Sequence, residues 1–276
     1  MSSVSLCMIV KDEEDFLDIC LKYVAPLVDE IIIMDTGSTD STPKIAKKYA
    51  TTYLEEEWQW NFSYHRNKVL ELARCDWVFS IDGDEIVTPF KPDCLRRWAT
   101  EAERKNATMV FCFAQQFGFE MPIIHKQGIS TSGFPLFKNN TGYQWYGHRH
   151  NKLSITPATL VTPYDNQSIT VPSVVDKGTH ITSFDYIGQH FGRLKRNWKD
   201  DFLAFYRWEN PNTIIDENNI EDYLRNKFLG MINVEEPSSL QQFGLKFEHI
   251  NKPFYYIGPY PEEIDKMDWV EKIPYI

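Results

Sequence analysis

Three carboxylates stand within four residues at Asp82-Gly83-Asp84-Glu85, directly after the apolar run Trp77–Ile81. Carboxylates this close repel one another unless a cation lies between them. Oxygen ligands of this kind suit Mg²⁺ or Mn²⁺, with substrate phosphates completing the coordination shell. Gly83 has no side chain, so a bulky anion can approach its backbone. The Asp82/Asp84 pair therefore predicts a metal and phosphate site. Taken alone, the segment is also typical of a solvated acidic turn or a Ca²⁺ loop.

The elements that must position this segment follow from apolar runs that alternate with helical patterns. Buried strands are predicted at Val4–Val10, Asp29–Asp35 and Trp77–Ile81, with helices between them and a short strand at Thr52–Leu54. This order indicates right-handed βαβ units in an α/β fold with a mostly parallel central sheet. Ligands bind such sheets at the carboxyl ends of the strands. We therefore expect the residues that follow the three longer strands to converge there: Lys11, Asp35 and Asp82.

A cation lies on the apolar stripe of the helix predicted at Asn61–Ala73. The spacing of Phe62, Arg66, Val69 and Ala73 places Arg66 on the inward face. A cation in that position needs an anionic partner, because burying it unpaired is costly. A diphosphate ligand and a structural ion pair with Asp82 are both compatible with the pattern.

Composition limits the classes of partner. The chain has 276 residues, 42% of them hydrophobic, and a formal net charge of -10. An acidic balance argues against nucleic-acid binding, which needs clustered Lys and Arg. The five Cys form no C-x-x-C pair, which favours a reducing compartment. With neither a signal-peptide pattern nor a run of about 18 apolar residues, the expectation is a cytoplasmic protein without a transmembrane segment.

Three regions follow from the pattern. Residues 1–105 form the βαβ half, residues 106–185 are predicted to carry short antiparallel strands of the same domain, and residues 186–276 are predicted to form helices and a tail rich in aromatic residues and Pro. The helices expected in the last region span Tyr186–Trp208 and Glu221–Ile232. The pattern leaves the oligomeric state open.

An ordered set of motifs makes the pattern specific. The chain resembles family 2 glycosyltransferases of the GT-A fold, a likeness that spans roughly residues 4–182 and is strongest toward the subgroup of lipopolysaccharide-core and bacteriocin-peptide glycosyltransferases. The motifs that carry it are Cys7-Met8-Ile9-Val10-Lys11-Asp12-Glu13-Glu14, Asp29–Asp40, Trp60-Asn61-Phe62-Ser63 with Arg66-Asn67, Asp76–Glu85, and more weakly Pro135–Asn139 and Gly147–His150.

The resemblance implies a donor site for a nucleotide-diphospho-sugar, by default a UDP-sugar. By that likeness Val10, Lys11 and Asp35 hold the base and ribose, whereas Asp82 contacts ribose or metal. The D-x-D motif then supplies Asp84 as the direct ligand of Mn²⁺ or Mg²⁺, and His180 resembles a late histidine that completes the metal shell. Arg66 and Gly83 adjoin the donor phosphates. The acceptor implied is a glycan, a lipid-linked sugar or a peptide, and transfer is implied to invert the anomeric centre.

The acceptor side departs from the family pattern. A His-Glu pair is expected after Tyr146-Gly147, but Asn151 follows His150 where the Glu would stand. Inverting transfer needs a base to deprotonate the acceptor, and the candidates are Glu85, His150 and Asp165. His148 and His150 are equally typical of hydrogen-bonded loop histidines.

Two other classes fit parts of the sequence. Asp35-Thr36-Gly37 reads as an aspartic-protease loop, but that chemistry needs two such aspartates and the chain holds a single copy, so a dimer is required. The Asn at position 151 also makes a non-catalytic module that binds nucleotide-sugars or glycans on the same fold a rival hypothesis.

Overall fold

The computed structural model describes residues 1–87, 93–116, 132–147, 152–154, 158–161, 168–171, 180–190 and 262–267. Its first part alternates strands and helices as the apolar runs predict. Four strands pair in parallel there: β1 (Val4–Val10), β2 (Glu30–Asp35), β3 (Thr52–Glu55) and β4 (Trp77–Ser80).

Strand β1 lies at the point where the strand order reverses. It pairs with β2 on one side and with β4 on the other, and β3 continues beyond β2. The chain thus moves outward from β1 to β3 and then returns to place β4 on the opposite side. In an open α/β sheet, the crevice outside the carboxyl ends of strands at such a switch point is the usual ligand site.

The remaining strands extend the sheet beyond β4. The full order in the described part of the chain is β3-β2-β1-β4-β7-β6-β12-β5, and two separate antiparallel pairs lie outside it. The predicted α/β class with a mostly parallel central sheet and small antiparallel sheets is confirmed. The added strands are β5 (Glu85–Val87), β6 (Met109–Gln116), β7 (Ser132–Lys138) and β12 (His180–His190), and the pairs are β8 (Gln144–Tyr146) with β9 (Lys152–Ser154) and β10 (Ala158–Val161) with β11 (Ser168–Val171).

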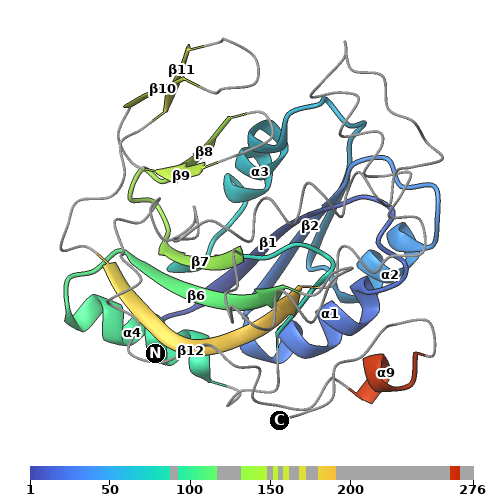
Figure 1. Ribbon diagram of the computed structural model, residues 1–276, viewed down its shortest axis with the longest axis horizontal. Helices are drawn as coiled ribbons and strands as arrows, with labels where there is room; N and C mark the ends of the chain where they lie inside the picture. Colours follow the sequence, from blue (N-terminus) through green and yellow to red (C-terminus); the bar gives the residue numbers. More distant parts are fainter. Residues whose placement is uncertain are drawn as a thin grey trace, which may run out of the picture.

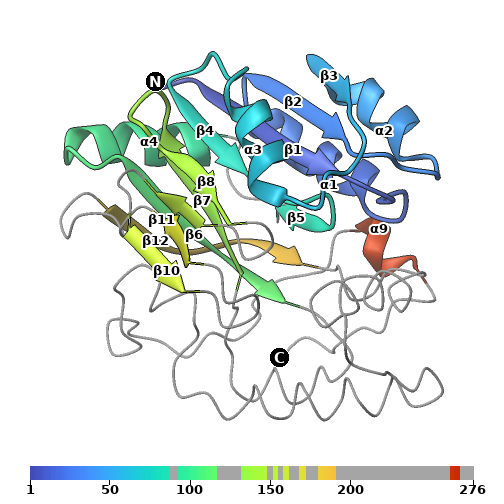
Figure 2. The same ribbon diagram turned by 90° about the horizontal axis from the view of Figure 1, so that it is seen from above.

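Helices cover both faces of the sheet (Figures 1 and 2). Because side chains alternate along a strand, Leu6 and Met8 of β1 face one apolar cluster whereas Cys7 and Ile9 face the other. The first cluster packs under α1, α2 and α4, and the second packs under α3. The helices span α1 (Leu17–Val24) with the 3-10 turn η1 (Ala25–Leu27), α2 (Thr42–Tyr49), α3 (Phe62–Leu70) and α4 (Cys94–Arg104).

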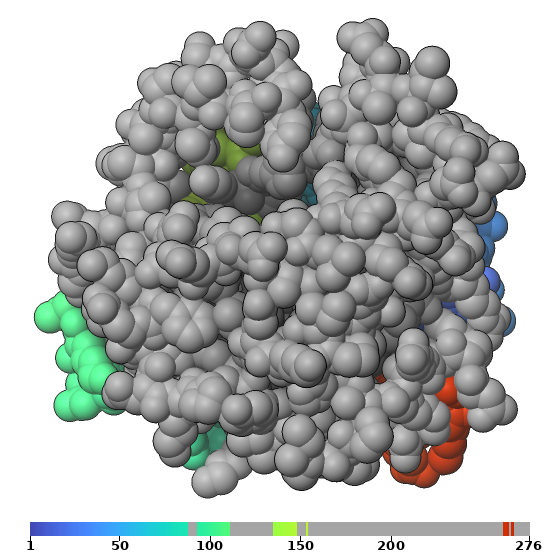
Figure 3. Space-filling view, in the orientation of Figure 1, coloured from blue at the N-terminus to red at the C-terminus, as the bar shows by residue number. Residues whose placement is uncertain are grey.

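A short C-terminal helix, α9 (Glu262–Asp265), docks onto α1. Its Ile264 is buried in the first cluster, and its Glu263 accepts a hydrogen bond from the Tyr23 hydroxyl at 3.1 Å and pairs with Lys22. In the space-filling view, α4 and α9 reach the surface on opposite sides of the molecule (Figure 3). Within the described residues, no helix has the length and apolarity needed to cross a membrane.

One predicted helix is partly wrong. Residues 186–190, where a helix was expected to begin at Tyr186, form the end of β12. They are extended because they pair in parallel with β6 and antiparallel with β5, contacts that local periodicity does not reveal. The rest of that prediction and the helix at Glu221–Ile232 lie outside the described residues. Helix α4 was not predicted, although Leu95, Ala99 and Ala102 give it a buried stripe.

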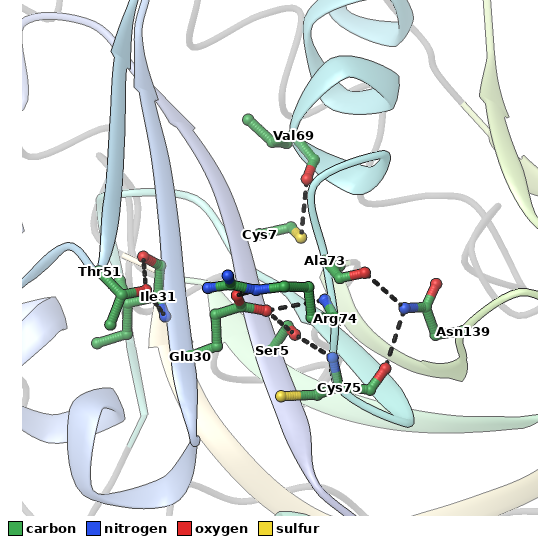
Figure 4. A network of polar contacts seen from close by, with 10 residues as sticks. All are labelled: Ser5, Cys7, Glu30, Ile31, Thr51, Val69, Ala73, Arg74, Cys75 and Asn139. Carbon is green, nitrogen blue, oxygen red and sulfur yellow. Dashed lines mark hydrogen bonds and ion pairs between the residues drawn. The ribbon is translucent and has the colours of Figure 1, made fainter.

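A buried polar network ties the amino-terminal edge of the sheet together (Figure 4). Glu30 is 5% exposed and accepts hydrogen bonds from the Ser5 hydroxyl at 2.6 Å and from the Arg74 backbone N–H and Nε at 2.9 and 2.7 Å. Nearby, Asn139 Nδ2 donates to the carbonyls of Ala73 and Cys75 at 2.9 and 3.0 Å. The loop between α3 and β4 is therefore held by two side chains, Glu30 of β2 and Asn139 after β7.

We expect Glu30→Gln to lower the free energy of unfolding at neutral pH by about 1–3 kcal/mol, because hydrogen bonds to a charged group are lost. Burial alone raises the pKa of Glu30, but the bonds from Ser5 and Arg74 outweigh it and hold the pKa below its ordinary value of 4.5. The unfolded chain therefore binds this proton more readily, and the stabilisation is present above that value and lost as pH falls through the folded pKa.

Urea unfolding of both proteins across this pH range measures the difference. It should be constant near neutral pH and shrink in acid, and a difference that does not change with pH would contradict the assignment. Glu55→Gln is the control, because its pair with Lys47 is exposed and should contribute little.

Candidate active site

The residues that follow β1, β2 and β4 meet at one edge of the sheet, as predicted. Val10 and Asp35 are register partners at the ends of β1 and β2. The Val10 carbonyl accepts hydrogen bonds from the Thr36 backbone N–H at 2.9 Å and from its hydroxyl at 3.0 Å. Asp82 follows β4, which pairs with the other side of β1. The switch point of the sheet is thus lined by the predicted polar residues.

Asp35 is 2% exposed and has one engaged and one free carboxylate oxygen. Oδ1 accepts the backbone N–H groups of Gly37 and Ser38 at 2.9 and 2.8 Å. Oδ2 is buried and has no hydrogen-bond partner in the described part of the chain. Gly37 has φ +95°, and Lys11 Nζ lies 4.0 Å from the position a Cβ would take on it. This turn therefore presents a buried acceptor atom beside an exposed cation, and both were predicted as binding residues.

The acidic segment forms a tight turn that Glu85 holds closed. Glu85 Oε2 accepts the Asp82 backbone N–H at 2.7 Å, and the Asp82 carbonyl accepts the Glu85 N–H at 3.1 Å. Asp84 and Glu85 are 7% and 6% exposed, whereas the Asp82 side chain is 45% exposed. Asp82 is thus the accessible carboxylate, and the buried Glu85 shapes the turn.

Arg66 reaches this turn from α3 and is 8% exposed, as its place on the helix stripe predicts. One guanidinium nitrogen donates to Asp82 Oδ1 at 2.5 Å and the other to the Ser80 hydroxyl at 3.2 Å. The ring of Trp145 covers the guanidinium, with Cζ 4.9 Å from the ring centroid. Nε is buried without a hydrogen-bond partner among the described residues. The structural ion pair with Asp82 is therefore present, and the guanidinium retains donor capacity.

The electrostatics of the turn act on the buried thiol of Cys20. Burial first, and then the charges of Glu85, Asp84, Glu13 and Asp82, raise the pKa of this thiol well above its ordinary value. The Cys20 thiol donates to the Asp82 carbonyl at 3.7 Å. The charges of these four carboxylates therefore all act on the space occupied by this thiol.

Glu13 is a neighbour that sequence reasoning did not single out. It follows β1 and is 8% exposed, and its Cγ lies 3.0 Å from the position of a Cβ on Gly83. Gly83 is therefore required by close packing against Glu13, in addition to any approach of a ligand. The signal was available, because Glu13 follows a strand whose end was already expected to lie at this edge.

The metal ligands are only partly brought together. Among the side chains that the structure describes, no group of three His, Cys, Asp or Glu residues could hold a metal ion by itself. His180 does not join Asp82 and Asp84, because it pairs with Met109 at the opposite end of β6 from Gln116. At about 3.3 Å per residue, β12 carries the chain roughly 30 Å further before it reaches His190. His190 is the register partner of Glu85.

Two of the three candidate bases, His150 and Asp165, lie outside the described residues, as do His148 and Asn151. The preceding segment is held by α3, because Asn67 Nδ2 donates to the Trp145 carbonyl at 2.9 Å, the Trp145 N–H donates to Asn67 Oδ1 at 2.8 Å, and the Ser63 hydroxyl donates to the Gly147 carbonyl. The chain therefore enters the predicted acceptor segment from a fixed point.

Comparison with known proteins identifies the family of this chain. The family model "Glycosyl transferase family 2" matches residues 5–157. A TPR repeat-containing protein of Synechococcus elongatus is 46% identical over 85 residues, which cover 31% of this chain and 21% of that protein. The SPbeta prophage-derived glycosyltransferase SunS of Bacillus subtilis is 35% identical over 86 residues, or 30% of this chain and 20% of that one. The chain thus spans about a fifth of the length of these relatives.

Similar solved structures include glucosyl-3-phosphoglycerate synthase from Mycobacterium tuberculosis in complex with Mn²⁺ and UDP-glucose. It has a TM-score of 0.38 and 18% identity, and the match covers 51% of this chain and 57% of that chain. The structure is an α/β domain with a cluster of polar residues at the switch point of its sheet. The chain belongs to glycosyl transferase family 2.

The contact between Gly83 and Glu13 is testable. In Gly83→Ala the added Cβ would lie 3.0 Å from Glu13 Cγ and 3.3 Å from Cβ and Cδ. We expect the free energy of unfolding to fall by about 1–3 kcal/mol, as in other overpacked sites. In a Glu13→Ala background the cost should be smaller, because Cγ and Cδ are gone. Urea unfolding of the four proteins measures this coupling, and equal costs in both backgrounds would rule the contact out.

Proposed function

We propose that this protein is a metal-dependent glycosyltransferase that moves a sugar from a nucleotide-diphospho-sugar, by default a UDP-sugar, to a glycan, lipid-linked or peptide acceptor with inversion. The observation that carries the proposal is the Arg66–Asp82 pair at the end of β4, with the buried Asp35 carboxylate at the end of β2 on the other side of β1. A cation and two acidic turns at a switch point suit a ligand with a polar base at one end and a charged diphosphate at the other.

The base and ribose fit the side of β1 that faces β2. Asp35 Oδ2 is a buried acceptor without a partner in the described residues, and leaving such an atom unpaired is costly. A base N–H or a ribose hydroxyl would satisfy it. Lys11 and the backbone at Val10 adjoin the same position, consistent with the roles that the family resemblance assigns to them.

The diphosphate and the metal fit the side of β1 that faces β4. Arg66 Nε has no hydrogen-bond partner among the described residues and is a donor available to a phosphate oxygen. Asp82 and Asp84 offer the hard oxygen ligands that Mn²⁺ or Mg²⁺ takes, and substrate phosphates complete such shells when fewer than three protein ligands are present. When bound, the metal neutralises charge that develops on the leaving diphosphate.

We propose that Glu85 is not the general base. Its Oε2 already accepts the Asp82 N–H, and the residue is 6% exposed, so we propose that it positions the turn. His150 and Asp165 remain the candidates for general base, on the sequence argument alone. The family assignment leaves the aspartic-protease hypothesis without support, and the non-catalytic module is the rival that an assay must separate.

Asp84→Asn tests the proposed metal ligand. We expect release of nucleoside diphosphate from a UDP-sugar with Mn²⁺ to fall at least a hundredfold, since removal of a group that stabilises the transition state typically costs that much. Thermal unfolding checks that the variant is folded. EDTA should abolish the release of nucleoside diphosphate by the natural protein. Full activity in the variant would refute the assignment. Donor binding without release under any acceptor would support the non-catalytic module.

We propose His190, the register partner of Glu85 in β12, as the metal histidine in place of His180. We expect His190→Ala to raise the Mn²⁺ concentration for half-saturation about tenfold or more in the presence of UDP, as loss of a metal-site interaction does. His180→Ala should leave it unchanged, because His180 pairs with Met109 at the far end of the strand. Electron paramagnetic resonance of free Mn²⁺ measures both, and the opposite pattern would restore His180.

A further inference from the structure

We propose that Trp145 and Asn67 are positioning residues that hold Arg66 in place for the donor diphosphate. The inference rests on the proposed function, because it assigns to these residues a role in the same site. Neither residue contacts the acidic turn in the described contacts, and Arg66 is the link between them and Asp82.

Helix α3 presents a polar face toward both halves of the site. Ser63, Arg66 and Asn67 have the spacing i, i+3 and i+4, so they share one side of the helix. Arg66 extends to Asp82 and Ser80, whereas Asn67 forms two hydrogen bonds with the backbone of Trp145. Adjacent residues of one helix turn thus bind the donor turn and strand β8.

The guanidinium of Arg66 is enclosed by three side chains: Asp82, Ser80 and Trp145. Asp82 and Ser80 bind two of its nitrogens, and the indole ring lies over it at 4.9 Å. A cation over an aromatic face is stabilised, and more strongly where water is excluded. The ring also removes rotamers that would turn Arg66 away from Asp82. The remaining donors of Arg66 are therefore held toward the turn before any ligand arrives.

The backbone clamp by Asn67 is needed because β8 belongs to another sheet. In the described part of the chain, β8 pairs with β9 in a two-stranded sheet separate from the one that holds β4. Ladder hydrogen bonds therefore do not fix Trp145 relative to Arg66. Asn67, with the bond from Ser63 to the Gly147 carbonyl, supplies that connection.

The first experiment measures hydrogen exchange of the Arg66 Nε–H by NMR, in the absence of any ligand. The Arg66 Nε–H resonance, assigned by its absence in Arg66→Lys, should exchange slowly with water in the natural protein. It should exchange about 3- to 30-fold faster in Trp145→Leu and Asn67→Ala, the range that loss of a cation–π contact corresponds to. Trp145→Phe keeps a ring and should recover most of the protection.

Two variants serve as matched controls. Asn139→Ala removes two side-chain bonds to backbone carbonyls at the opposite edge of the sheet, as Figure 4 shows. Tyr143→Leu removes a buried aromatic residue of the same segment that packs on Phe137. Both should lose stability comparably to the test variants yet leave the Arg66 resonance protected. Equal exchange in test and control variants would overturn the inference.

The second experiment measures the dissociation constant of UDP with Mn²⁺ by calorimetry. We expect it to rise about 3- to 30-fold in Trp145→Leu and Asn67→Ala, and not in the controls. If the natural protein binds UDP and all variants bind equally, the positioning role is refuted and the proposed function stands. If the natural protein binds no UDP but the exchange pattern holds, the proposed function fails while the enclosure of Arg66 stands.

Discussion

The ion pair between Arg66 and Asp82 is the interaction on which the edge site depends. A guanidinium that is 8% exposed must be matched by negative charge, since an unpaired cation in that position would cost several kcal/mol. The partner carboxylate is 45% exposed, so the pair is buried on one side and open on the other. Such a pair adds little net stability, because desolvation offsets much of the attraction. Its arrangement is better explained by a ligand that joins it from the open side.

The surrounding residues adjust the charge at this pair. Glu85 satisfies the Asp82 backbone N–H, and the thiol of Cys20, kept neutral by burial and by the neighbouring carboxylates, occupies the space behind the turn. A neutral group there adds no further negative charge to the cluster. Because carboxylates outnumber the cation that pairs with them at the turn, a divalent ion would balance the site while a monoanionic ligand would not.

The sequence predicted the part of the fold that local patterns determine. Apolar runs located β1, β2 and β4, and the rule that parallel strands place their carboxyl ends together brought Lys11, Asp35 and Asp82 to one edge. The helical stripe also predicted that Arg66 is buried. Local patterns do not reveal which distant strands pair or in which register. His180 and His190 occur in the same strand, and only the register of β12 against β5 and β6 distinguishes the end that lies beside the acidic turn.

Trp145 illustrates the same limit at the level of a side chain. Its segment, Tyr143-Gln144-Trp145-Tyr146, is rich in aromatic residues, a pattern that fits a stacking surface as well as ordinary packing. The function of the ring depends on Arg66, which precedes it by 79 positions, and on Asn67, which fixes its backbone. In the described residues, α3 contacts the turn at Asp82 through Arg66 and contacts β8 through Asn67. Displacement of α3 by a ligand at Arg66 would therefore move Gly147, the residue before the histidines, together with it.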